Sequence, residues 1–189
     1  MPLTNPLGDI PITDPQAMRA LAHPVRLAVL VHLQRNGPAT ATTLSPHVGA
    51  TPSVTSWHLR HLATFGLVID APADEVPGDR RQRWWKAVAR GFSFAPSDDP
   101  AAQMLADQMY AMAHAQVDQW MTETRPRLSP EWLRASGLSN TMVRLTPDEL
   151  AAVADKIDEL LAPFVRRGDD APAGARRVRV LRHYLPAES

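Results

Sequence analysis

The chain has 189 residues, of which 44% are hydrophobic, with no cysteine and a formal net charge of zero. This size suits one domain, or one domain with a substantial extension, and the lack of cysteine excludes disulfide frameworks and thiolate metal sites. No apolar run approaches the roughly 18 residues of a membrane span, and the N-terminus lacks a secretory signal. We therefore expect a cytoplasmic protein with no membrane partner.

The zero net charge hides an uneven distribution. Residues 1–95 carry a net charge of +3 and residues 96–189 a net charge of −3. Within the first half, residues 80–90 hold five basic side chains and no acid. Such a stretch favours contact with phosphates, although a solvated charged hairpin would look the same. The first half is therefore the better candidate for binding a polyanion.

Proline and glycine divide the first half into predicted elements. Residues 1–13 hold three prolines and no periodic pattern, which predicts a flexible N-terminal arm. Residues 14–95 are expected to form one domain, in which Asp14 caps the first helix. The helices are predicted over residues 15–22, 24–35, 40–48 and 52–65.

The helix predicted over residues 52–65 has the features of a DNA-reading helix. Thr51 is a good N-cap, Pro52 a good first residue, and Gly66 lies where a helix ends. Helical spacing turns three side chains inward: Thr55, Leu59 and Leu62. It leaves a short polar and basic set for DNA: Ser53, Ser56, Trp57 and Arg60. Two short helices joined at a Gly, with such a face, form a helix-turn-helix.

Two strands are predicted after this helix, over residues 67–71 and 82–89, because β-branched and aromatic residues flank a loop rich in Pro, Gly and Asp. A basic hairpin in this place is the wing of a winged helix. We assign wing contacts with DNA to Arg80, Arg81 and Arg83, although three acids of the hairpin oppose that role: Asp74, Glu75 and Asp79. Adjacent Trp84 and Trp85 must face opposite ways, so one of them is expected in the core.

Three runs together resemble the arsenical-resistance-repressor (ArsR) family of bacterial winged-helix regulators. They are LAHPVRLAVL from Leu21, SWHLRHL from Ser56 and FGLV from Phe65. The runs RWWKA from Arg83 and GFSF from Gly91 are similar to an actinobacterial branch without cysteine. The resemblance covers roughly residues 15–90. It implies a homodimeric, usually repressing regulator that binds an inverted-repeat operator in double-stranded DNA and is released by an effector.

Metal sensing, which occurs in that family, has little support here. His58 and His61 are three residues apart on one helix, but both belong to the resembling motif. His114 with Asp107 and Asp118 would be a poor transition-metal set without a partner chain. We expect no metal and no cofactor, and keep a His/carboxylate metal-responsive regulator as an alternative.

The second half, residues 96–189, is expected to hold a dimerisation and effector region. A long helix over residues 100–124 carries a broad apolar face suited to a dimer seam. Its proposed dimer residues are Leu105, Met109, Met112, Val117 and Trp120. A capping box at Thr146 opens a helix to about Arg167, with six apolar residues turned inward: Leu150, Val153, Ile157, Leu160, Leu161 and Phe164. Strands are predicted on either side, over residues 141–145 and 177–185.

The predicted fold class is therefore mainly α with a small β wing, extended by a strand-helix-strand unit. No catalytic motif is present, so we expect no enzyme. The function predicted is a sequence-specific, homodimeric repressor of transcription, and a small-molecule effector is a further expected partner. A winged helix used for protein interaction is the alternative from another class.

Overall fold

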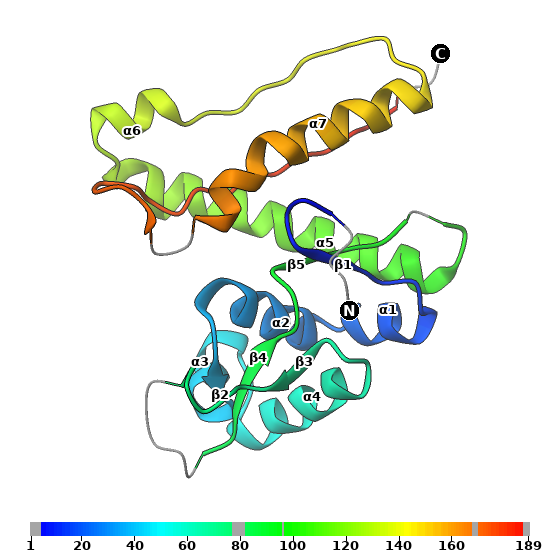
Figure 1. Cartoon of the computed structure of the whole chain (residues 1–189), viewed down its shortest axis with the longest axis vertical. Helices are drawn as coiled ribbons and strands as arrows, with labels where there is room; N and C mark the ends of the chain where they lie inside the picture. Colours follow the sequence, from blue (N-terminus) through cyan, green and yellow to red (C-terminus); the bar gives the residue numbers. More distant parts are fainter. Residues whose placement is uncertain (1–4, 77–81, 96, 168–169, 187–189) are drawn as a thin grey trace.

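The computed structural model describes residues 5–76, 82–95, 97–167 and 170–186, and for Arg166 the backbone alone. Two layers are visible in Figure 1: a lower unit of short helices with a small sheet, and an upper layer of longer helices. The long helix α5 (Pro100–Gln119) crosses above the lower unit. The part predicted to read DNA is therefore covered on one side by the second half of the chain.

The lower unit contains four helices: α1 (Pro15–Leu21), α2 (Pro24–Asn36), α3 (Ala41–Val48) and α4 (Pro52–Thr64). Each helix begins within one residue of its predicted start because each has an N-cap close in the sequence. For α1, Asp14 Oδ1 accepts a hydrogen bond from the Gln16 amide at 2.8 Å. Gly37 and Gly49 follow α2 and α3 with φ of 80° and 65°, which L side chains rarely adopt. Sharp helix ends thus follow from local chemistry.

In the described part of the chain, five short strands make two sheets. One sheet has the order β2–β4–β3, with β2 (Ala39–Thr40) and β3 (Val68–Asp70) both antiparallel to β4 (Trp84–Ala87). Hairpin β3–β4 is the predicted wing. Within it Trp85 is buried and Trp84 is half-buried, so the two indoles face opposite ways as predicted.

The second sheet differs from the sequence analysis. Strand β1 (Asp9–Pro11) pairs in parallel with β5 (Gly91–Ser93), and Ile10 and Ile12 are buried. Residues 9–12 therefore belong to the fold and are not part of a loose arm. The pairing was missed because it joins two three-residue strands some 80 residues apart, which leave no periodic signal.

The core draws side chains from α1 to α4, from the β2–β4–β3 sheet and from the start of α5. Its fully buried side chains include Leu21, Leu30, Leu44 and Leu59, and Leu105 of α5 belongs to the same cluster. Helix α5 packs on α1. The face of α5 that holds Ala101, Ala102 and Leu105 is thus part of the domain core, rather than a free dimer seam.

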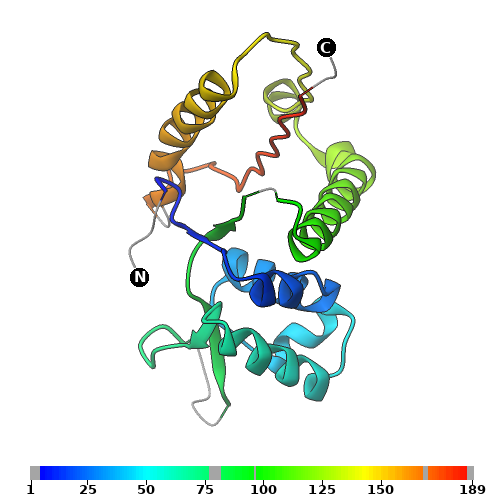
Figure 2. The same cartoon turned by 90° about the vertical axis from the view of Figure 1, so that its right-hand side faces the viewer.

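Beyond α5 the chain continues through the π-helical turn η1 (Trp120–Thr124), the 3-10 turn η2 (Arg125–Arg127) and α6 (Pro130–Ala135). Helix α7 (Pro147–Arg166) begins at the predicted capping box, where Glu149 N donates to Thr146 Oγ1 and Thr146 N to Glu149 Oε2. In Figure 2 the segment after α7 passes between α7 and α5.

Two expectations for this region are wrong. Residues 141–145 and 177–185 contain no strand, although Arg and apolar residues alternate at the start of the second segment. An alternating pattern forms a strand only where a neighbour supplies ladder hydrogen bonds, and neither segment has one. The six apolar residues of α7 that were predicted to face inward also differ in their exposure. Leu150, Ile157 and Leu161 are half-buried, whereas Val153, Leu160 and Phe164 are exposed by 36%, 68% and 59%. No described helix is both long and apolar enough to cross a membrane.

Candidate nucleic-acid interface

Helix α4 is fixed at its start by Thr51. The Thr51 hydroxyl accepts a hydrogen bond from the Val54 amide at 3.4 Å, and Thr55 Oγ1 donates to the Thr51 carbonyl at 2.9 Å. Pro52 occupies the first turn, where its missing N–H costs nothing. The N-terminal half of α4 is therefore well defined in position.

The two faces of α4 separate as the sequence predicts. Thr55, Leu59 and Leu62 are completely buried. Ser53, Trp57 and Arg60 are exposed, and Ser56 is half-buried. Polar, aromatic and basic groups thus share one free helix face, which is the composition that base-edge and phosphate contacts require.

Arg60 is held along the helix by Ser56. Its Nη1 donates a hydrogen bond to Ser56 Oγ at 2.7 Å, which leaves its other guanidinium N–H groups free for an acceptor. No ion pair of the described residues involves Arg60. Arg60 therefore presents its charged guanidinium group to solvent in a restrained orientation. This arrangement suits hydrogen bonds to a guanine edge or to a phosphate.

Trp57 is held by histidines on both sides. Its ring stacks on His61 at 5.4 Å with an interplanar angle of 5°, and meets the edge of His58 at 5.0 Å. The indole nevertheless remains 51% exposed. A large, restrained apolar ring at the surface is suited to contact a sugar or a thymine methyl group.

His58 is a structural residue beneath this face. It is only 4% exposed, and its ring lies 4.8 Å from that of His23. Burial, followed by the nearby positive groups His23, Arg26 and His61, lowers the pKa of His58. His23 Nδ1 accepts a hydrogen bond from the Val25 amide at 3.2 Å, which caps α2. Both imidazoles are therefore neutral near pH 7 and join α2 to α4.

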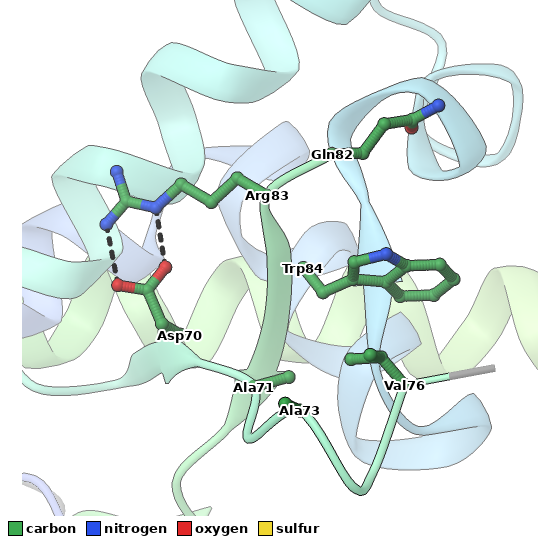
Figure 3. Close-up of a pocket in the computed structure, with 7 residues that line it drawn as sticks. All are labelled: Asp70, Ala71, Ala73, Val76, Gln82, Arg83 and Trp84. Carbon is green, nitrogen blue, oxygen red and sulfur yellow. Dashed lines mark hydrogen bonds and ion pairs between the residues drawn. The ribbon is translucent and has the colours of Figure 1, made fainter. Parts of the chain in front are cut away.

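In the wing, Arg83 is engaged within the protein. Its Nε and Nη2 donate to Asp70 Oδ1 and Oδ2 at 2.5 and 3.0 Å (Figure 3). Its guanidinium also lies 4.0 Å above the Trp85 ring. The paired hydrogen bonds raise the pKa of Arg83 and lower that of Asp70. A hollow of about 240 Å³ lies beside this pair, and Trp84 and Val76, drawn in Figure 3, are among the residues that line it. The charge of Arg83 is therefore largely neutralised before any ligand arrives.

The rest of the basic stretch is partly engaged as well. Lys86 Nζ lies 2.7 Å from Glu75 Oε1, and Arg90 Nη1 donates to the Val165 carbonyl. Arg80 and Arg81 lie outside the described residues. The positive charges of Arg83 and Lys86 are thus partly balanced by acids outside the basic stretch. Arg60 of α4 is therefore more available to a ligand than the basic side chains in the described part of the wing.

Sequence reasoning missed two contributors. Val54 is 45% exposed, one position after Ser53, and adds an apolar group to the free face of α4; helical spacing from Trp57 could have revealed it. Asp70 controls Arg83, but this contact depends on the pairing of β3 with β4, where Asp70 lies opposite Trp85. The sequence carries no signal for that register.

The proposed dimer residues are not equivalent. Leu105 is completely buried in the core of its own chain, so it is unavailable to a partner, and its assignment is wrong. Met109 is 38% exposed, and Met112, Val117 and Trp120 are half-buried. Among the described residues, no group of three or more His, Cys, Asp or Glu side chains is placed to hold a metal ion.

Comparison with known proteins agrees with this geometry. Residues 21–69, which run from the end of α1 into β3, match a family model described as a helix-turn-helix domain. The fold is a winged helix-turn-helix. A helix-turn-helix domain in this fold supports the interpretation of the chain as a DNA-binding transcriptional regulator.

The other comparisons add less. No curated protein matches the chain. Among solved structures, NMB1585, a MarR family regulator from Neisseria meningitidis, is 16% identical over 74% of this chain and 79% of its own, with a TM-score of 0.34. That score is too low to support an argument.

Proposed function

We propose that the protein is a non-enzymatic, cytoplasmic repressor of transcription of the ArsR type, which binds an inverted-repeat operator as a homodimer. One observation carries the proposal: α4 is capped at Thr51, buries one face completely and presents Ser53, Trp57 and Arg60 on the other. In this arrangement α4 enters the major groove, Arg60 contacts a guanine or a phosphate, and Trp57 packs on a sugar or a thymine methyl.

The homodimer is supported by apolar side chains that the single chain leaves exposed. On α5 these include Met104 at 54% and Tyr110 at 44%, and on α7 Leu160 and Phe164. Patches of this kind mark association surfaces on otherwise polar proteins. A twofold dimer would place two α4 helices in successive major grooves about one DNA turn apart. Release by a small effector would act on the separation of the two helices.

Selection of DNA from a random duplex library tests the proposal. The full chain should enrich an inverted repeat with half-site centres about 10 base pairs apart. Arg60→Ala should weaken binding to the enriched site roughly tenfold and reduce its salt dependence, whereas the matched variant Arg134→Ala, on exposed α6, should bind normally. Recovery of no enriched sequence, or equal binding by Arg60→Ala, would contradict the assignment.

A protein-interaction module is the second candidate, which the exposed apolar surface of the C-terminal half favours. Salt dependence separates the two. DNA binding through basic side chains weakens steeply as salt rises, while an apolar protein interface does not.

A further inference from the structure

A second hollow lies away from the DNA-reading face, between α2, α3 and α5. Its volume is about 180 Å³. Ala28 and Val31 of α2 and Met112 of α5 give it apolar walls. Its polar rim comes from three helices and consists of His32, Arg35, Asn36, His47 and Gln116. The hollow is therefore lined by both apolar and polar side chains.

The charged groups at this edge are all cationic or can become so. The rings of His32 and His47 lie 4.7 Å apart and join α2 to α3. The C-terminal segment brings further arginines, because Arg177 Nη1 donates to the Arg35 carbonyl at 2.6 Å. Arg179 lies close enough to Arg35 to affect its pKa. Three elements, α2, α3 and the C-terminal segment, thus direct positive groups to one place.

No described carboxylate balances this cluster. The described ion pairs lie elsewhere, at Asp70, Glu75 and Asp158. Burial and then Arg179 lower the pKa of Arg35 to about 10, and burial followed by His47 and Arg35 lowers that of His32. Arg35 stays charged at neutral pH, since 10 is well above 7. The like charges repel one another, and an anion placed among them would remove that cost.

We propose that this hollow binds a small organic anion, whose acidic group lies between Arg35, His32 and His47 and whose apolar part contacts Ala28, Val31 and Met112. An apolar body is specified because the walls are apolar and would gain nothing from a bare inorganic ion. The guanidinium supplies a paired hydrogen-bond donor for a carboxylate, and Asn36 and Gln116 add neutral partners.

The site also joins the two halves of the chain. It is shared by α2 and α3 of the helix-turn-helix and by α5, which packs on α1 and passes over the lower unit. An anion bound there would fix α3 relative to α5. The proposal goes beyond DNA binding and can be tested without DNA.

Nuclear magnetic resonance of the imidazole groups in the full chain, with benzoate as the probe, provides the test. Benzoate should shift the His32 and His47 resonances in a saturable manner and raise the lowered pKa of His32, because a bound anion favours the protonated form. The uncharged analogue benzamide and inorganic phosphate should bind at least tenfold more weakly. Binding should strengthen as pH falls from 7.5 to 5.5. Among the described residues, the titratable or charged groups at the hollow are His32 and Arg35 of α2, His47 of α3, and Arg177 and Arg179 of the C-terminal segment, while α5 contributes neutral Met112 and Gln116.

Substitutions separate binding from folding. Arg35→Gln should weaken benzoate binding roughly tenfold or more, and Arg35→Lys should recover part of it. His47→Gln, at an exposed position of α3, should weaken benzoate binding several-fold with little effect on the circular dichroism spectrum. The matched control is His114→Gln, an exposed position of α5 outside the hollow, which should bind as the unaltered chain.

Three results would overturn the proposal: no saturable shift with benzoate, equal binding of benzamide, or unchanged binding in both Arg35→Gln and His47→Gln. Phosphate binding without benzoate binding would overturn the organic character assigned to the ligand. None of these results depends on DNA, so the site can fail while the DNA-binding proposal stands.

Discussion

Asp70 holds Arg83 by two parallel hydrogen bonds, with Nε to Oδ1 at 2.5 Å and Nη2 to Oδ2 at 3.0 Å. The pair joins β3 to the start of β4 at the base of the wing and withdraws one arginine from the surface charge. Because both side chains are more than half exposed, the pair contributes little to stability, about 0–1 kcal/mol. Its main consequence is for the electrostatics of the wing.

Removing the acid should therefore strengthen nucleic-acid binding. Asp70→Asn leaves Arg83 with an uncompensated charge, so affinity for random-sequence duplex should rise a few-fold. The slope of log affinity against log salt should steepen by about 0.9, the value for one more phosphate contact. Fluorescence anisotropy at several salt concentrations measures both. Asp155→Asn, an exposed acid of α7, is the matched control, and an equal gain there would show that net charge alone is responsible.

Trp57 and Arg60 should differ in their salt dependence. Trp57→Ala should reduce affinity for the selected DNA site roughly tenfold with an unchanged salt slope, because the indole carries no charge. Arg60→Ala should reduce the affinity and also flatten the slope by about 0.9 if it contacts a phosphate. Both side chains are exposed, so the thermal unfolding temperature should change little. A flattened slope for Trp57→Ala would contradict the role given to the ring.

The N-cap of α4 should contribute measurably to stability. Thr51→Ala removes the acceptor for the Val54 amide and should lower the free energy of unfolding by about 1 kcal/mol, whereas Thr51→Ser keeps the hydroxyl and should cost less. Urea unfolding followed by circular dichroism gives both values. Equal stability of the two variants would mean that the cap has no energetic role.

Local chemistry explains why the helices were predictable. Asp14, Thr51 and Thr146 each accept a hydrogen bond from an amide two or three residues further along the chain. Both partners of each cap are therefore close neighbours in the sequence. The exposed face of α4 followed from the same helical periodicity. Contacts between distant segments had no such signal: β1 with β5, Asp70 with Arg83, and His23 with His58 depend on tertiary packing.

The errors in the second half have a related cause. Residues 177–185 alternate as a strand does, yet in the single chain their side chains contact helices instead: His183 stacks on Tyr110, and Arg182 lies 2.5 Å from Asp158. Leu105 was assigned to a dimer seam because apolar periodicity shows that a face is buried, without showing what covers it. Here α1 and the domain core cover it.

Buried His58 should make the protein less stable in mild acid. Its pKa is lowered in the folded state, so below the ordinary value of 6.5 the unfolded chain binds more protons than the folded one. The free energy of unfolding should therefore fall as pH decreases from about 6.5, with uptake of up to about one proton at this residue. The pKa values of His23, His32 and His61 are lowered too, and add to the effect.

Substitution isolates the share of His58. His58→Phe keeps an aromatic ring against His23 but cannot be protonated, so its stability should depend less steeply on pH between 7 and 5. His114→Gln, at an exposed position, should keep the original dependence. Chemical unfolding at several pH values measures the slopes. Identical slopes for His58→Phe and the unaltered chain would show that His58 titrates normally in the fold.

Leu105 and Met109 should report separately on the core and on association. Leu105→Ala opens a cavity in a completely buried position and should lower the free energy of unfolding by about 2–5 kcal/mol. Met109→Glu, one turn further along α5 and 38% exposed, should leave each chain folded but weaken the homodimer, because a charge would be buried at the interface. Analytical ultracentrifugation follows the dimer, and circular dichroism the fold. Met109→Leu, which keeps an apolar side chain at the same position, is the control and should dimerise as the unaltered chain does. If Met109→Glu dimerises as the unaltered chain does, this part of α5 is not the seam, and the exposed Leu160 and Phe164 of α7 become the surface to test in its place.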